Sequence, residues 1–78
     1  MKTVITFGTF DVFHVGHLRL LQRARTLGER LLVGVSSDAL YIAKKGRAPV
    51  YHQDDRIAII AGLACVDGVF LCLLYTSD

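Results

Sequence analysis

Apolar residues along the chain change their spacing several times, and each change marks the boundary of a predicted element. Residues 3–7, TVITF, and residues 30–36, RLLVGVS, are continuous apolar runs rich in β-branched side chains, which is typical of buried strands. Residues 68–75, GVFLCLLY, form a third run of this kind. We therefore predict three strands, the first of which ends at Gly8.

The stretches between these runs have helical spacing. From Val15 onward, apolar residues recur at steps of three or four positions: Leu18, Leu21, Ala24 (with Leu20 flanking) and Leu27. This amphipathic pattern predicts a helix, and Gly28 stands where a left-handed cap would end it. A short helix is predicted over residues 38–45, where SSD (residues 36–38) offers caps, and another over 52–64 with two aspartates in its first turn.

The order of the elements predicts the fold class. A strand, helix, strand, helix, strand order favours parallel pairing with right-handed crossovers. We therefore expect the N-terminal β-α-β-α-β part of a Rossmann-like, three-layer α/β/α fold with a parallel sheet.

Composition and charge exclude some classes of function but do not identify one. The 78 residues are 53% hydrophobic and carry a net charge of +2 with both signs mixed, which indicates one globular domain and no broad basic surface for nucleic acid. The longest strongly apolar run near the C-terminus, residues 69–74, is far shorter than the roughly 20 residues of a membrane span, and no secretory signal opens the chain. Cys65 and Cys72 are expected to be reduced, in a cytoplasmic protein. So small a domain is compatible with a homodimer.

The segment GTFDVFHVGH, residues 8–17, carries the most chemistry. It lies where the first strand gives way to the first helix, at the sheet edge where such folds bind ligands. The free N–H groups of a helix start favour a phosphate. His14 and His17 are one helical turn apart and can both donate to phosphate oxygens, while Gly16 leaves the backbone open to a close approach.

Other interpretations of this segment stay open. Each histidine could be a helix cap or a half-buried structural residue. Two histidines could also belong to a zinc site, but Asp11 is the only near candidate for a third ligand, and we expect no metal site. A dinucleotide loop is excluded because the segment has no G-x-G-x-x-G pattern.

The segment resembles the H-x-G-H signature of the nucleotidyltransferase superfamily. The longer run VITFGTFDVFHVGHLRLLQRARTLGERLLVGVSSD is similar to glycerol-3-phosphate cytidylyltransferases. Related adenylyltransferases, including those acting on heptose phosphates, share the motif and a segment like CVDGV, residues 65–69. The resemblance implies transfer of a cytidylyl group from CTP to glycerol 3-phosphate, with ATP and a sugar- or pantetheine-type phosphate as the alternative. Pyrophosphate would leave, and Mg²⁺ would arrive with the triphosphate.

The resemblance also implies roles for individual residues. The nucleotide-binding residues it implies are Gly8, Thr9, Phe10, His14, Gly16 and His17. The catalytic residues it implies are His14, His17, Lys44 and Arg56. The acceptor-binding residues it implies are Asp11, Lys44 and Arg56, with Asp11 also able to order its loop. Lys45 and Arg47 are neighbours without a defined role. For the lysines, the competing interpretation is a solvated charge in a loop. For Arg56, it is local pairing with Asp54 or Asp55, or solvation.

The sequence departs from this family in two ways. Tyr41 stands where the cytidylyltransferases tend to carry a polar residue, and a second signature of the form R-T-x-G-[IV]-S-T is missing. We hypothesise a partial cytidylyltransferase-like nucleotide-binding domain over residues 1–70 and a non-native tail over residues 71–78. An inactive nucleotide-binding or assembly module is therefore the alternative to an enzyme. A fragment of a class I aminoacyl-tRNA synthetase is disfavoured because the motif lies so near residue 1.

Overall fold

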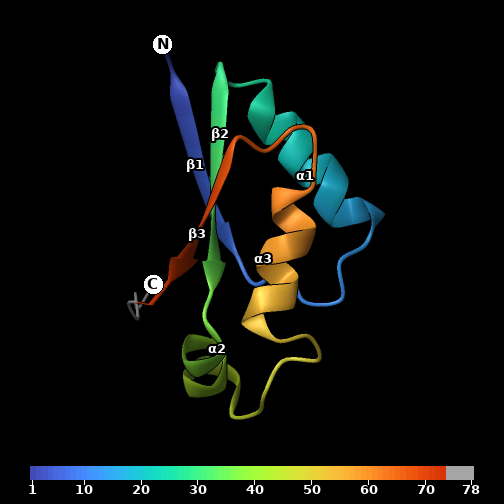
Figure 1. Cartoon of the computed structure of the whole chain (residues 1–78), viewed down its shortest axis with the longest axis vertical. Coiled ribbons are helices and arrows are strands. Elements are labelled where there is room, and N and C mark those ends of the chain that lie inside the picture. Colours follow the sequence, from blue (N-terminus) through green and yellow to red (C-terminus); the bar gives the residue numbers. More distant parts are fainter. Residues whose placement is uncertain (74–78) are drawn as a thin grey trace.

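The computed structural model describes residues 1–73, and these form a parallel sheet with helices (Figure 1). The elements are β1 (Thr3–Gly8), α1 (Val15–Arg25), β2 (Arg30–Ser36), α2 (Asp38–Lys45), α3 (Gln53–Ala61) and β3 (Gly68–Cys72). All the predicted elements are present, although α3 ends at Ala61 instead of residue 64. The end of the third predicted strand at residue 75, and residues 74–78 of the hypothetical tail, lie outside the described residues.

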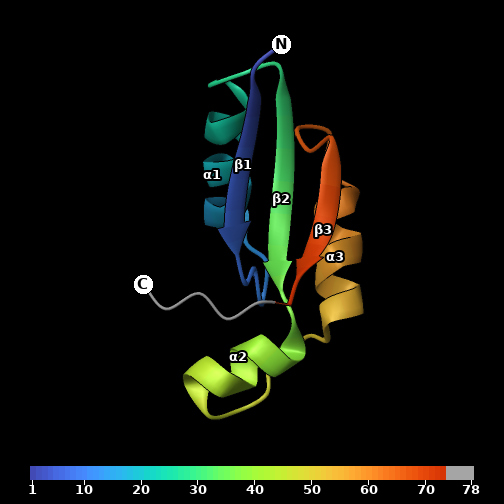
Figure 2. The ribbon, with the colours of Figure 1, turned by 90° about the vertical axis from the view of Figure 1, so that its left-hand side faces the viewer.

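The sheet has the order β1-β2-β3, and both pairings are parallel. Figure 2 looks onto the sheet from its uncovered side, with α1 and α3 both behind it and α2 beyond the carboxyl end of β2. Right-handed crossovers that step across a sheet in one direction place their helices on the same face. The Rossmann-like α/β fold with a parallel sheet is thus confirmed, and residues 1–73 contain one of the two helical layers that we expected.

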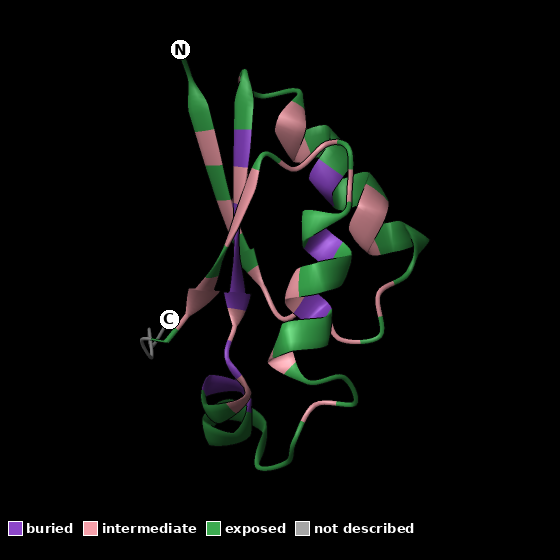
Figure 3. Ribbon diagram, in the orientation of Figure 1, coloured by how far each residue is buried: buried purple, intermediate pink, exposed green. Residues whose placement is uncertain are grey.

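The hydrophobic core lies between β2 and the two crossover helices. Leu31, Val33 and Val35 of β2 are fully buried, and they cluster with Leu21 of α1 and Ile60 of α3. Figure 3 shows this burial along the central strand and on the inner sides of the helices. Each such side chain contributes about 1.5–3 kcal/mol through burial. No helix within residues 1–73 is long and apolar enough to cross a membrane.

The opposite face of the sheet carries aromatic side chains that remain largely exposed. Phe7 of β1 and Phe70 of β3 meet edge to face, with ring centroids 5.8 Å apart. They close over Gly34 of β2, where an added Cβ would lie 2.6 Å from a ring carbon of Phe7. Glycine at position 34 therefore allows the two rings to meet across the central strand.

The predicted role of Gly28 as a left-handed cap is wrong. Helix α1 ends at Arg25, and its cap residue Thr26 is right-handed, with φ of −72°. Among the glycines of residues 1–73, only Gly46, which caps α2, has a positive φ. Gly28 is required for a different reason: a Cβ there would lie 2.6 Å from the carbonyl oxygen of Lys2. The turn between α1 and β2 thus packs directly against the backbone that leads into β1.

We expect Gly28→Ala to lower the free energy of unfolding by about 1–3 kcal/mol, because the methyl group would collide with backbone rather than with a movable side chain. The matched control is Gly62→Ala, where the new Cβ would meet Ala58 O at an ordinary 3.5 Å. Its effect should stay within about 0.5 kcal/mol. Urea denaturation of the two variants measures the difference. Equal stabilities would contradict the close approach at Gly28.

Candidate functional site

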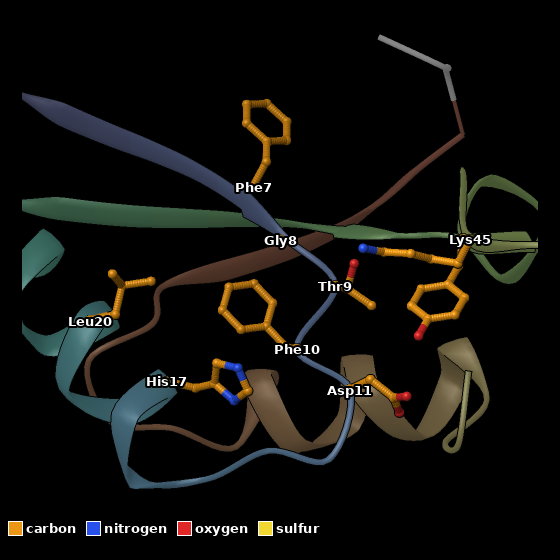
Figure 4. A pocket seen from close by; sticks show the side chains of 9 residues that line it. Phe7, Gly8, Thr9, Phe10, Asp11, His17, Leu20 and Lys45 are labelled. Carbon is orange, nitrogen blue, oxygen red and sulfur yellow. The ribbon is translucent and has the colours of Figure 1, made fainter. Parts of the chain in front are cut away.

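Two cavities open at the carboxyl end of the sheet and share a wall. The larger has a volume of about 390 Å³ and is lined by Phe7, Gly8, Thr9, Phe10, Asp11, His17, Leu20, Tyr41 and Lys45 (Figure 4). The smaller, of about 300 Å³, is lined by Phe7, Gly8, Thr9, Ser36, Leu40, Lys44 and Cys72. The end of β1 and the residue after it, Thr9, therefore separate two spaces at the edge where ligands bind in folds of this class.

His14 and His17 form the start of α1 together. The backbone N–H of Gly16 donates to Nδ1 of His14 at 3.0 Å, and the backbone N–H of His14 donates to Nδ1 of His17 at 3.2 Å. The two rings lie 4.0 Å apart between centroids. The interpretation of these histidines as caps is thus confirmed as one of their roles. It does not exclude contact with a ligand, because each ring keeps its Nε2 atom for another partner.

The capping contacts also fix the protonation of the rings. A nitrogen that accepts a hydrogen bond carries no proton, so each neutral ring bears its proton on Nε2. Burial lowers the pKa of His17 below its usual value, and the nearby His14 lowers it further. His17, which lines the larger cavity, is therefore a neutral Nε2–H donor at pH 7. The first turn of α1 contains no acidic side chain, so its positive end is not neutralised locally.

The loop between β1 and α1 is held in an unusual backbone conformation. Phe10 and Val12 have φ of 54° and 51°, in the left-handed region that a β-branched residue such as valine avoids. The buried ring of Phe10 packs against Gly8, where a Cβ would lie 2.7 Å from it, and meets His17 edge to face. Such strain persists where surrounding contacts hold it. Here it presents Thr9 and Asp11 to the larger cavity.

Asp11 ties this loop to the segment that precedes α3. Its two carboxylate oxygens accept the backbone N–H groups of Val50 and Tyr51, each at 2.8 Å. Burial opposes ionisation of Asp11, but these backbone hydrogen bonds, together with one from Val12 and the charge of Arg56, hold its pKa below the usual value. The loop-ordering role considered for Asp11 is therefore present. Its role in acceptor binding stays a prediction.

Arg56 is placed differently from our expectation. Its side chain has no exposed surface and lines neither cavity. Its hydrogen-bond acceptors are Tyr51 O at 3.0 Å, Thr9 O at 2.9 Å, Ser36 O at 2.7 Å and Asp38 Oδ1 at 2.7 Å. A guanidinium held in this way has no bidentate face left for a phosphate, so the expected phosphate grip is not supported. The alternative of local pairing with Asp54 or Asp55 is also wrong, because the partner is Asp38.

Asp38 is the counter-ion of this buried cation. Burial opposes ionisation of Asp38, but the hydrogen bond from Arg56, with a backbone hydrogen bond and the charge of Arg56, holds its pKa below the usual value. Ser37 is the residue that caps α2, since its hydroxyl oxygen accepts from the N–H of Leu40. Asp38 therefore pairs with Arg56 and is not the N-cap residue of α2.

The two lysines of α2 face different cavities. Lys44, the lysine that we expected near the phosphates, lines the smaller cavity, and Lys45 lines the larger one with His17. Figure 4 shows the Lys45 side chain extending toward Thr9. Tyr41, which sequence reasoning treated only as a departure, also lines the larger cavity. Spacing along α2 could have indicated this link, because positions 41 and 45 lie on one helical face.

The described residues do not offer a metal centre of their own. Within residues 1–73, no group of three or more histidines, cysteines or carboxylates is placed to hold an ion. Asp11 is the one carboxylate among the residues that line the larger cavity, and both its oxygens already accept backbone hydrogen bonds. These side chains do not fit a protein-held magnesium ion.

A parallel α/β sheet with paired histidines and a lysine at its carboxyl edge defines a Rossmann-like domain. The chain belongs to the Cytidylyltransferase-like family, whose sequence profile matches residues 5–75. It is 48% identical over 71 residues to the bifunctional protein HldE of Campylobacter concisus (strain 13826), covering 90% of this chain and 15% of that protein. The bifunctional protein HldE of Shewanella denitrificans is 48% identical over 69 residues, covering 87% and 14%.

A solved structure has the same fold. The lipopolysaccharide core biosynthesis protein from Thermoplasma volcanium GSS1 superimposes with a TM-score of 0.85 at 33% identity, over 94% of this chain and 59% of that one. The chain thus spans about a seventh of its HldE relatives and somewhat more than half of this neighbour.

We expect the His17 ring to titrate below 6.5, its ordinary value, with Nδ1 unprotonated in the neutral form. Two-dimensional ¹⁵N–¹H NMR of the ring across pH 4–8 measures both properties. In His14→Asn the pKa of His17 should rise towards 6.5, because a neighbouring charge is removed, without passing it, because burial remains. Titration at or above 6.5 in the wild type would contradict this geometry.

Proposed function

We propose that this chain provides the site for nucleotidyl transfer from a nucleoside triphosphate to a small phosphorylated acceptor. The larger cavity carries the proposal, because it combines a neutral histidine donor, a lysine and the positive end of α1 at one place. All three favour the negative charge of a triphosphate. The family assignment supports the same class of reaction.

The proposed reaction needs no nucleophile from the protein. An ionised oxygen of the acceptor phosphate attacks the α-phosphorus, a new P–O bond forms, and the bond to pyrophosphate breaks with its electron pair on the leaving group. In this proposal His17 donates through Nε2–H to the triphosphate, Lys45 balances charge beside it, and Thr9 lies between the two bound substrates. His14 offers its Nε2–H next to His17. Catalysis of this kind is positioning and charge stabilisation.

The two cavities suggest how the substrates divide. The larger one would hold the triphosphate and the smaller one, with Lys44 and Ser36, the acceptor phosphate. Magnesium, if it takes part, would arrive with the triphosphate, where it neutralises charge on the leaving pyrophosphate. The homodimer and the cytoplasmic location stay predictions.

Two substrate pairs are candidates. The similarity to HldE proteins and to a lipopolysaccharide core biosynthesis protein favours ATP with a sugar phosphate such as a heptose phosphate. The run from Val4 to Asp38, which is similar to glycerol-3-phosphate cytidylyltransferases, favours CTP with glycerol 3-phosphate as the second candidate. The relatives make the first pair our preferred one.

We expect the chain to release pyrophosphate from ATP when a heptose phosphate is present, and His17→Ala to reduce this rate at least about a hundredfold. A coupled pyrophosphate assay measures it, beside CTP with glycerol 3-phosphate. Release with CTP alone would move the assignment to the second pair. Binding of triphosphate without release from a folded chain would instead identify an inactive nucleotide-binding module.

The two neighbouring lysines give a matched pair of variants. Lys45→Ala should weaken triphosphate binding by about tenfold, because it removes a charge from the larger cavity, whereas Lys44→Ala should chiefly raise the KM for the acceptor. Isothermal titration with a non-hydrolysable triphosphate analogue and acceptor-dependent kinetics separate the effects. Equal effects of both substitutions on both substrates would contradict the division of the cavities.

A further inference from the structure

Arg56 is a buried charge that the proposed reaction does not use directly. Its side chain is completely buried, although it carries a permanent positive charge. A charge is stable in such a place when it is paired and its donors are satisfied. Within residues 1–73 no buried side-chain nitrogen or oxygen lacks a hydrogen-bond partner. The donors of Arg56 are therefore satisfied within the protein, and its role follows from the groups to which it donates.

The guanidinium joins three separate segments of the chain: the loop after β1, the junction between β2 and α2, and the segment before α3. Nη1 donates to the carbonyl oxygens of Thr9, directly after β1, and Ser36, at the end of β2. Nε donates to Tyr51 O, in the segment before α3, and Nη2 donates to Asp38, the first residue of α2. A planar fork with donors in fixed directions sets the spacing of these acceptors.

Two of these acceptors belong to residues that line the cavities. Thr9 lines both cavities, and Ser36 lines the smaller one. Tyr51 also donates its N–H to Asp11, so its carbonyl and its N–H connect Arg56 to the other side of the strained loop. Phe10, with its left-handed backbone, lies between Thr9 and Asp11, which are the two anchored residues.

We propose that Arg56 is a positioning residue for nucleotidyl transfer: it holds Thr9 and the strained loop in place between the two substrates without touching either. The inference rests on the proposed function. Because the reaction depends on alignment of two phosphates, a shift of about 1 Å in this wall is expected to reduce the rate by up to about a hundredfold.

The test compares Arg56→Lys with Arg23→Lys, an exposed arginine of α1, in the 78-residue chain. Lysine keeps the positive charge and loses the fork. We expect Arg56→Lys to lower kcat at least about tenfold while triphosphate binding changes less than about threefold. Amide NMR signals of residues 9–12, 36 and 51 should move, while that of Leu21 in the core should not. Arg23→Lys should leave all of these unchanged.

A measurement on the wild type keeps the proposal testable if the variant does not fold. The Nε–H signal of Arg56 should be protected from exchange and should hardly move when inorganic pyrophosphate is added. A large shift of this signal with pyrophosphate would identify Arg56 as a direct ligand and overturn the proposal. The same conclusion would follow if Arg56→Lys lost triphosphate affinity while the amide signals of the loop stayed in place. Unchanged kcat in a folded Arg56→Lys would overturn it too. If the wild type releases no pyrophosphate with either substrate pair, the proposed function fails, while the loop signals still show whether Arg56 holds the loop.

Discussion

All three strands run in the same direction, so their carboxyl ends lie along one edge of the sheet. The rest of the structure depends on this arrangement, because the segments that leave that edge carry the polar and charged groups. The histidine pair follows β1, α2 with its two lysines follows β2, and Arg56 enters from α3. Parallel pairing requires long crossovers, and here these crossovers supply the groups of the site.

A second constraint is the strained loop after β1. Two left-handed residues, one of them valine, are unfavourable by themselves, and the structure keeps them with contacts from distant parts of the chain. Asp11 holds the loop by accepting the backbone N–H groups of Val50 and Tyr51. Arg56 holds it by donating to Thr9 O, while its Nε donates to Tyr51 O. The loop is thus held by residues from distant parts of the chain, and one of them, Arg56, lines neither cavity.

The sequence predicted the elements well because their spacing is local. Apolar runs identified the strands, and the position of GTFDVFHVGH after the first of them placed the histidines at the ligand-binding edge. The role of Arg56 was not predictable in the same way, since its partner Thr9 lies 47 residues away. Which cavity each of Lys44 and Lys45 lines depends on how α2 is rotated relative to the sheet, and no local sequence pattern determines that rotation. The conformation of Val12 was hidden because valine is a residue that normally avoids it.

The capping of α1 by its own histidines has a consequence for how mutants of this protein are interpreted. Serine, threonine, aspartate and asparagine are the residues preferred at the start of a helix. Here the atoms that begin the helix also fix which ring nitrogen carries the proton, so secondary structure and acid–base chemistry are coupled in one motif. An alanine at either position therefore removes a structural element and a chemical group together. Asparagine at position 14 can begin a helix but cannot donate as an imidazole does. His14→Asn therefore removes the imidazole and keeps the helix cap.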